Sequence, residues 1–220
     1  DVSDNELTNL DLSSCPNLIS LYCYDNQLAS INLNSCTELT FIWCDDNQLT
    51  TLDLSSCSKL TELLCSGNKF TSLDLSPCKA LERFFCRDQS QKISSLDFSS
   101  CTALTELSLD GSNVSSLNLS SCTALTDLYL GGSKVSSLNL SSCTALTELS
   151  LYSMGLTSLN LNSCTALTEL NCSNNELTSL DLSSCKALES FSCSNNKVKI
   201  SSLDFSSCTA LTDLYLGGSK

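Results

Sequence analysis

Cysteine is the residue type in this sequence whose number and spacing most suggest chemistry. The 220 residues contain sixteen cysteines and no histidine. Ten cysteines follow one another at steps of 21 or 23 residues, and six more each lie eight residues after a member of that first series. The first series is Cys15, Cys36, Cys57, Cys78, Cys101, Cys122, Cys143, Cys164, Cys185 and Cys208, and the second is Cys23, Cys44, Cys65, Cys86, Cys172 and Cys193. Regularly spaced thiols could form disulfides, bind a metal ion or act as nucleophiles.

Packing is the role that the spacing favours for these cysteines. If each step adds one strand to a sheet, neighbours in a series lie about 4.8 Å apart. That separation permits a disulfide, but stacked side chains point the same way, which the disulfide dihedral opposes. A zinc site needs about four ligands around one point, and a linear ladder does not converge. A small apolar thiol fills a turn well, so we expect free thiols, with disulfides and a metal site as the alternatives.

An asparagine follows five of the six cysteines of the second series three residues later, and Asn5 follows Val2 at the same spacing. The members of this asparagine series are Asn5, Asn26, Asn47, Asn68, Asn175 and Asn196. We expect these amides to stack as a ladder and to bond the backbone of their own turn and of the next coil, because a buried amide needs partners. Where leucine replaces the second cysteine, serine or methionine replaces the asparagine, as in Leu130 with Ser133.

The composition argues against several classes of function. The absence of histidine removes the commonest general base and the commonest metal ligand, and no glycine-rich phosphate loop leads from a strand into a helix. We therefore expect no enzyme activity and no cofactor. The net charge of −13 repels phosphate backbones and anionic lipids. Because no apolar run approaches the roughly 20 residues that span a bilayer, neither nucleic acid binding nor membrane insertion is expected.

The cysteines belong to a repeat of 21 residues that covers nearly the whole chain. Counting from the first leucine as position 1, positions 4, 6, 15 and 17 are apolar with polar neighbours. This period of two indicates short strands with one inward face. We predict a mostly β solenoid of about ten coils of 21–23 residues, with two short parallel strands per coil, two parallel sheets and little or no helix. The coils begin at residues 7, 28, 49, 70, 93, 114, 135, 156, 177 and 200.

One coil shows the pattern clearly. The inward positions of residues 156–176 are Leu156, Leu159, Leu161, Cys164, Leu167, Leu170, Cys172 and Asn175. This order of Leu, Cys and Asn resembles the nested 21-residue (IRREKO-type) class of bacterial leucine-rich repeats, over residues 7–220. The resemblance implies a right-handed solenoid with a binding or scaffolding role, in a protein that is secreted or on the surface of a bacterium. The cytoplasm is the alternative, because unpaired cysteines persist there.

The organisation of the chain follows from the same pattern. Residues 1–220 are expected to form a single solenoid. Solenoids need capping units with polar outer faces. The repeat pattern shows no such unit, so we also expect this solenoid to be a fragment that lacks both end caps. Open ends would expose unpaired strand edges and core leucines, so end-to-end self-association is a further expectation.

The first strand of each coil presents small polar residues outward, which indicates a flat, solvated wall. Position 5 is Asp11, Asn32, Asp53, Asp74, Asp97, Asn118, Asn139, Asn160, Asp181 and Asp204. Consecutive aspartates at strand spacing repel one another, and weakly bound Ca²⁺ could relieve that repulsion. The regular rows of hydroxyl groups leave a flat ice-binding surface as another alternative.

The second strand presents a different surface in the first four coils. Aromatic and arginine side chains are typical of protein-binding hot spots, and a contiguous apolar patch on a soluble surface usually has a role. The residues of this aromatic–arginine patch are Tyr22, Tyr24, Phe41, Trp43, Leu64, Arg83, Phe85 and Arg87. We predict a non-enzymatic module that binds a protein, or a glycan, through this patch. A passive structural spacer is the alternative.

Overall fold

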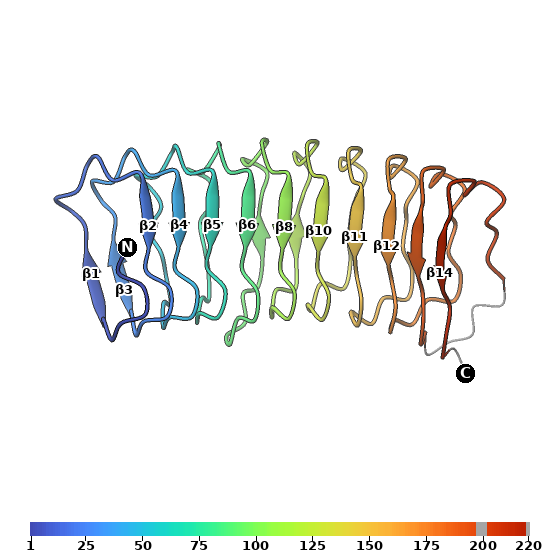
Figure 1. Cartoon of the computed structure of the whole chain (residues 1–220), viewed down its shortest axis with the longest axis horizontal. Helices are drawn as coiled ribbons and strands as arrows, with labels where there is room; N and C mark the ends of the chain where they lie inside the picture. The colour runs from blue at the N-terminus through green and yellow to red at the C-terminus, as the bar shows by residue number, and fades with distance from the viewer. Residues whose placement is uncertain (197–201, 219–220) are drawn as a thin grey trace.

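The computed structural model describes residues 1–196 and 202–218. It shows a solenoid of coils stacked in chain order, with β1 near one end and β14 near the other (Figure 1). Each coil contributes one strand to a continuous parallel sheet of ten strands. No helix lies within the described ranges. These ranges therefore contain no helix that is long and apolar enough to cross a membrane. The predicted β solenoid of about ten coils is confirmed.

The ten-stranded sheet follows the order of the chain, and identical repeat positions face one another across every pair. Its strands are β2 (Ser20–Tyr22), β4 (Phe41–Trp43), β5 (Glu62–Leu64), β6 (Arg83–Phe85), β8 (Glu106–Ser108), β10 (Asp127–Tyr129), β11 (Glu148–Ser150), β12 (Glu169–Asn171), β13 (Ser190–Ser192) and β14 (Asp213–Tyr215). Leu21 lies opposite Ile42, and Phe84 lies opposite Leu107 although 23 residues separate them. The two extra residues of the fourth coil are therefore accommodated outside the strands.

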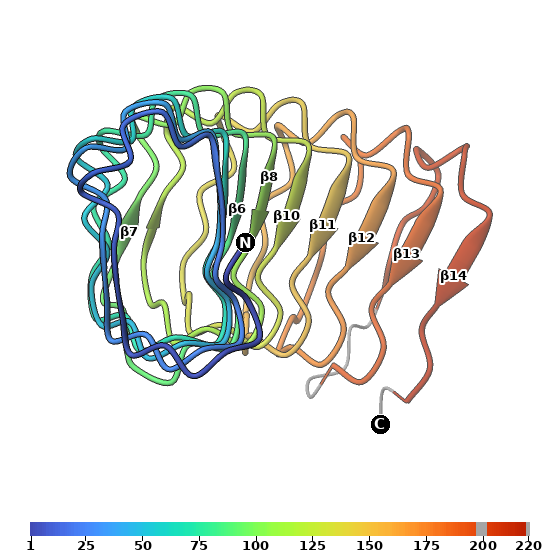
Figure 2. The same cartoon turned by 60° about the vertical axis from the view of Figure 1, so that its left-hand side comes forward.

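The opposite wall of the tube is less regular than the sequence suggested. Hydrogen-bonded strands form there only as two pairs within the described ranges, β1 (Asn9–Asp11) with β3 (Ser30–Asn32) and β7 (Leu96–Asp97) with β9 (Leu117–Asn118). Figure 2 shows β7 across the tube from β6 and β8.

The side chain at position 5 explains where the strands of this wall end, since β1, β3, β7 and β9 all stop at that position. In every coil its oxygen accepts a hydrogen bond from the backbone N–H two residues later, as between Asp53 and Ser55. Such a local bond turns the chain out of the extended conformation.

The core between the two walls consists of leucine, isoleucine, valine, phenylalanine and cysteine. Full burial of each large apolar side chain contributes roughly 1.5–3 kcal/mol. Phenylalanine pairs occupy the core where a coil is two residues longer. The rings of Phe84 and Phe98 lie 5.4 Å apart, and those of Phe191 and Phe205 lie 5.7 Å apart. Most other coils carry leucine at these positions, so the larger rings fill the space that the longer coils create.

The cysteine ladder is confirmed, and several of its thiols donate hydrogen bonds to backbone carbonyls. All sixteen cysteines lie within the described ranges and are free. The thiol of Cys36 donates to the carbonyl of Leu12 in the preceding coil at 3.5 Å, and that of Cys65 donates to the carbonyl of Phe85 in the following coil at 3.4 Å. Burial raises the pKa of Cys23 to about 12 and that of Cys57 to about 11. These thiols therefore pack as neutral groups.

The asparagine ladder forms as well, but its amides reach backwards along the solenoid. The Nδ2 atom of Asn68 donates to the carbonyls of Cys65 and Ser66 in its own coil, and to Cys44 of the preceding coil at 2.9 Å. Its Oδ1 atom accepts from the N–H of Leu49. The prediction that these amides bond the next coil is wrong. The carbonyl that the strand pairing leaves without a partner lies in the preceding coil. Where serine replaces asparagine, the buried hydroxyls of Ser112 and Ser133 have no partner.

Position 19 of every coil adopts the left-handed backbone conformation, with φ between 50° and 77°. Its residues are Asp25, Asp46, Gly67, Asp88, Gly111, Gly132, Ser153, Asn174, Asn195 and Gly218. Glycine, asparagine and aspartate tolerate this conformation better than other residues. Ser153 is the exception to that preference.

We predict that Ser153→Gly stabilises the solenoid by about 0.5–1 kcal/mol, because glycine removes the steric cost of the positive φ. Chemical denaturation measures the free energy of unfolding. Ser183→Gly is the matched control, since Ser183 is an exposed serine outside the set with positive φ. A fall in stability for Ser153→Gly equal to that of the control would contradict the explanation.

We also predict that iodoacetamide labels at most Cys15 in the folded protein. Cys15 is half-buried, whereas the other fifteen thiols are buried, and most of those have pKa values raised by burial, such as Cys78 at about 12. Mass spectrometry after labelling, with and without denaturant, counts the modified thiols. Rapid labelling of several cysteines in native conditions would show that the core is accessible.

Candidate partner-binding surface

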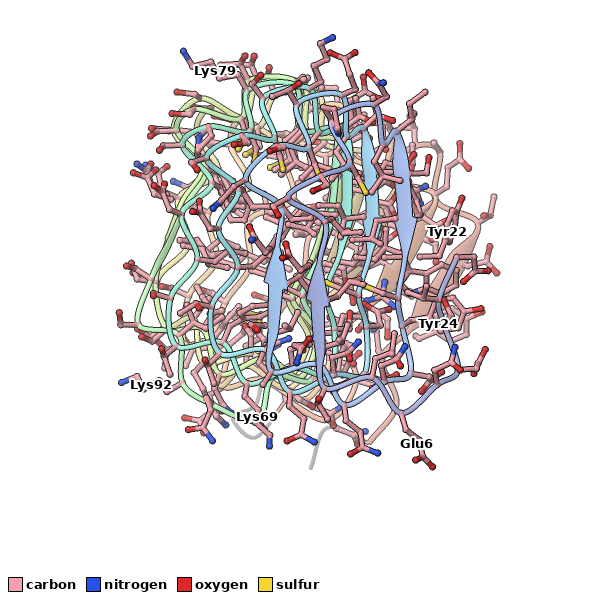
Figure 3. The ribbon with its side chains drawn as sticks, turned by 90° about the vertical axis from the view of Figure 1, so that its left-hand side faces the viewer. Glu6, Tyr22, Tyr24, Lys69, Lys79 and Lys92 are labelled. Atoms are coloured by element: carbon pink, nitrogen blue, oxygen red, sulfur yellow. The ribbon has the colours of Figure 1, made fainter. Side chains whose placement is uncertain are left out.

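The structure brings the residues of the aromatic–arginine patch together on the outer face of the first four coils. Tyr22 lies in β2, Phe41 and Trp43 lie in β4, and Leu64, Arg83 and Phe85 lie in β5 and β6. Tyr24 and Arg87 lie two residues after β2 and β6. Figure 3 shows Tyr22 and Tyr24 projecting outward from one wall of the tube, while sulfur atoms lie inside it. The alternation of inward and outward side chains along each strand places them there.

The aromatic side chains of the patch pack against one another. The ring centroids of Tyr24 and Trp43 lie 4.3 Å apart, those of Tyr22 and Phe41 lie 5.0 Å apart, and those of Tyr22 and Trp43 lie 6.4 Å apart. The rings are half-buried rather than fully exposed, because each covers part of its neighbour. The patch is therefore a preformed aromatic surface, and a partner would have few rotamers to immobilise on binding.

The two arginines of the patch enclose Phe85 and are themselves paired. The guanidinium groups of Arg83 and Arg87 lie 5.3 Å and 5.1 Å from the centre of the Phe85 ring. Arg83 bridges two neighbouring coils, since its Nε lies 2.8 Å from Glu106 and its Nη1 lies 3.2 Å from Glu62. The hydrogen bond to Glu106 raises the pKa of Arg83.

Arg87 interacts with one neutral and one acidic residue of the next coil. Its Nε donates to the hydroxyl of Ser108 at 2.6 Å. Burial raises the pKa of Asp110, and the positive charge of Arg87 partly offsets that rise. Glu62, Glu106 and Ser108 were not predicted from the sequence as supports of the patch. The signal was present, because these residues occupy the same repeat positions as the arginines or their neighbours in adjacent coils.

Asp45 positions the only tryptophan of the chain. It accepts a hydrogen bond from Trp43 Nε1 at 2.9 Å and another from the backbone N–H of Ser66 at 2.6 Å. Asp110 accepts in the same way from the N–H of Gly131. Outward side chains at position 18 thus bond the following coil and form a further ladder, which the sequence analysis did not predict.

The later coils carry an acidic and more open surface on the same sheet. Glu106, Asp127, Glu148 and Glu169 face one another across β8, β10, β11 and β12, an arrangement that like charges disfavour. Burial, followed by a hydrogen bond to Glu148, raises the pKa of Tyr129. A groove of about 260 Å³ lies over β10–β14, with Tyr129 and Tyr215 among its lining residues.

The aspartates of the opposite wall have few oxygen atoms free to bind a metal ion. The backbone N–H of Ser55 occupies one oxygen of Asp53 and lowers the pKa of that carboxyl, and other aspartates of the row behave alike. Asn32 also donates to Asp11 across the strands at 2.9 Å. Within the described ranges, no three or more Cys, Asp or Glu side chains form a group able to hold a metal ion.

The Asp45–Trp43 contact yields a test by pH. Because burial raises the pKa of Asp45, we predict that tryptophan fluorescence titrates with a midpoint above the ordinary aspartate value of about 3.9. The folded state then takes up this proton before the unfolded state does as the pH falls. Asp45→Asn should abolish the transition while Asp46→Asn, the control, preserves it. A transition that persists in Asp45→Asn would exclude Asp45 as its source.

Comparisons with known proteins agree with the repeat and the fold. The family model described as Leucine Rich repeats (2 copies) matches residues 165–204. The functional domain of InlJ from Listeria monocytogenes, described as including a cysteine ladder, is 32% identical with a TM-score of 0.88. The match covers 97% of this chain and 47% of that one, so this chain spans about half the length of the InlJ domain. No curated protein gives a significant match.

Two more distant structures share the fold. A leucine-rich repeat protein of Leptospira interrogans is 23% identical with a TM-score of 0.75, over 96% of this chain and 64% of that one. The leucine-rich repeat protein FLRT2, solved in a complex with Latrophilin 3 and Unc5D, is 20% identical with a TM-score of 0.68, over 86% and 64%. The 21-residue repeat, the parallel β coils and the cysteine ladder of this chain are those of leucine-rich repeat proteins.

Proposed function

We propose that this solenoid is a non-enzymatic module that binds another protein through the aromatic–arginine patch. The observation that carries the proposal is the stacked cluster of Tyr22, Tyr24, Phe41 and Trp43, which stands beside Phe85 and its two arginines. Tyrosine, tryptophan and arginine dominate the binding energy of many protein interfaces. Leucine-rich repeat proteins are typically binding modules, which supports the proposal at the level of the fold.

The pairing of the arginines defines the chemistry of the partner. Glu62 and Glu106 already neutralise Arg83, and Ser108 accepts a hydrogen bond from Arg87. An acidic or phosphorylated partner would have to displace these bonds. The centre of the patch suits an apolar or aromatic side chain that packs on the half-buried rings, while the arginine stems provide further apolar surface.

A glycan is the second candidate, because flat aromatic rings also stack on the apolar faces of sugars. Tyr22 and Tyr24 are half-buried residues, and their hydroxyl groups would bond sugar hydroxyls there. Protein is favoured over glycan by the arginine and leucine members of the patch. The solved FLRT2 complex, in which a leucine-rich repeat protein assembles with other proteins, is a precedent at the level of the fold.

The setting of this module is also a proposal. We place the chain outside the cell, secreted or on a bacterial surface, because the repeat class resembles bacterial proteins and the 32% identical InlJ domain comes from Listeria monocytogenes. Among the described residues, no strand pairs with the outer edge of β14, and Leu214 and Leu216 are 46% and 40% exposed. A second copy stacked end to end would cover them, and sedimentation at increasing concentration tests for that.

The triple variant Tyr22→Ser, Trp43→Ser, Phe85→Ser tests the binding proposal. We expect it to lose affinity for any captured protein partner by more than tenfold, since each is a candidate hot-spot residue. Affinity chromatography over mixtures of extracellular proteins and a glycan array identify the ligand, and surface plasmon resonance then measures the loss. The double variant Tyr129→Ser, Tyr152→Ser alters outward tyrosines of later coils and is the matched control.

Circular dichroism must first show that both variants fold like the original chain. Equal binding by the original chain and the triple variant, with folding intact, would contradict the proposal. If the control alone loses binding, the later coils carry the site. If neither chain captures a protein or a glycan, the spacer becomes the better account, and ice-binding and Ca²⁺ assays then test the opposite wall.

A further inference from the structure

The groove over the later coils has a defined length and floor. Its lining residues come from the five strands β10 to β14, and Tyr129 and Tyr215 stand at its two ends. The strand register places Ser150, Asn171 and Ser192 between these tyrosines, at the same repeat position on successive strands. The groove therefore exists because three small polar side chains lie between two large rings.

The row of residues beside this floor is acidic. Its members are Asp127, Glu148, Glu169, Ser190 and Asp213. Glu148 and Glu169 line the groove itself. The cations of the ion pairs in the described ranges are Lys59 and Arg83, which belong to the third and fourth coils. No described lysine or arginine thus neutralises the carboxylates of this row, although like charges on neighbouring strands repel one another.

The two end carboxylates of the row are held in place by hydroxyl groups. Thr126 donates to Asp127 at 2.6 Å, and Thr212 donates to Asp213 at 2.8 Å. The acidic side chains also act on one end of the groove, because burial first and then these carboxylates raise the pKa of Tyr129. A negative charge is disfavoured there, and a groove lined by one sign of charge attracts ligands of the opposite sign.

We propose that this groove docks an extended, basic segment of a partner protein. Four strand spacings of about 4.8 Å place the two tyrosines roughly 19 Å apart along the sheet. An extended segment of about six residues spans that length at about 3.3 Å per residue. Alternate side chains of such a segment point the same way, so lysines at every second position face the acidic row together.

The tyrosines and the floor suit the same occupant. A cation near the face of a tyrosine ring is attracted to it, so Tyr129 and Tyr215 add favourable contacts at the two ends. The small side chains of Ser150, Asn171 and Ser192 leave room for the segment and present polar groups to its backbone. Charge complementarity of this kind determines which partner binds more than how tightly it binds.

Other classes of occupant fit this groove less well. Nucleic acids and other anions are repelled by the carboxylate row. A neutral sugar would leave that row without a counter-charge. For a bound metal ion, the described part of the chain offers no group of three or more candidate ligands.

The groove is separate from the aromatic–arginine patch. The patch lies in and directly beside β2, β4, β5 and β6, whereas the groove lies over β10 to β14. Arg83 and Arg87 give the early half of the sheet positive charges that repel a basic segment. The two halves therefore select partners of different charge, and the groove does not depend on the function proposed for the patch.

Isothermal titration calorimetry with a capped six-residue peptide that alternates lysine and serine tests the proposal. We expect binding that weakens as the salt concentration rises, because salt screens exposed charges. Glu148→Gln with Glu169→Gln should lower the affinity by about tenfold, since it removes the charges that line the groove. Glu6→Gln with Glu82→Gln is the matched control. It changes the net charge equally at exposed carboxylates outside the groove and should keep the affinity.

Two further comparisons separate shape from charge. Ser150→Tyr fills the floor without changing any charge and should lower the affinity by about tenfold. An isomeric peptide with three serines followed by three lysines places at most two lysines on one face and should bind several-fold more weakly. Circular dichroism first shows that each variant folds like the original chain.

Three results would overturn the proposal. The first is that the original chain does not bind the alternating peptide at low salt. The second is that the Glu148→Gln, Glu169→Gln variant binds as tightly as its control. The third is equal affinity for the two isomeric peptides, which would show attraction to diffuse charge alone. The variant Tyr22→Ser, Trp43→Ser, Phe85→Ser should bind the basic peptide like the original chain, so failure of the patch proposal leaves this one standing.

Discussion

Everything in this molecule depends on the vertical stacking of identical repeat positions at the spacing of neighbouring strands. Leu21 faces Ile42 and Leu149 faces Leu170 because every coil returns to the same register. Each inward position therefore becomes a row, and a polar group in a row meets the same environment in each coil. Cysteine and asparagine recur because the same backbone groups recur in each coil. The thiol packs at a turn, and the amide donates hydrogen bonds to carbonyls that the strand pairing leaves without a partner.

The same constraint shapes the outer surface. A side chain on the sheet has neighbours directly above and below it, so opposite charges and aromatic rings combine across coils. Arg83 lies between Glu62 and Glu106, and Tyr24 packs on Trp43. The early coils thereby gain a preformed aromatic surface. The later coils place Glu106, Asp127, Glu148 and Glu169 in one row, and the two halves of the sheet present different chemistry.

The repeat period made much of this architecture predictable. The inward rows, the ten coils and the outward location of the patch follow from spacing alone, since alternation along a strand fixes the face of each residue. The direction of the asparagine bonds does not follow, because it depends on which carbonyl the strand pairing leaves open. The weak first wall was missed for a related reason. Asp53 and its equivalents look like solvated surface residues, yet each bonds the backbone of its own turn.

The support of the tryptophan was beyond simple pattern reading, unlike Glu62 and Glu106, which share the repeat position of Arg83. Asp45 looks like a surface aspartate, but it is bonded to Trp43 and to the next coil. Recognising it requires the side-chain geometry of two coils together. The half-burial of the aromatic rings likewise arises from contacts across coils. A binding surface on a solenoid is therefore read best from rows of neighbours, rather than from the residue types of one coil.

The most direct measurement of the central claim is hydrogen–deuterium exchange of the chain, alone and bound to a captured partner. The account predicts slower exchange in the complex at residues 20–24, 41–45, 62–66 and 83–87, with little change at the matching positions of the later coils. Protection confined to the later coils, or to the wall that contains β1 and β7, would contradict the claim that the aromatic–arginine patch is the contact surface.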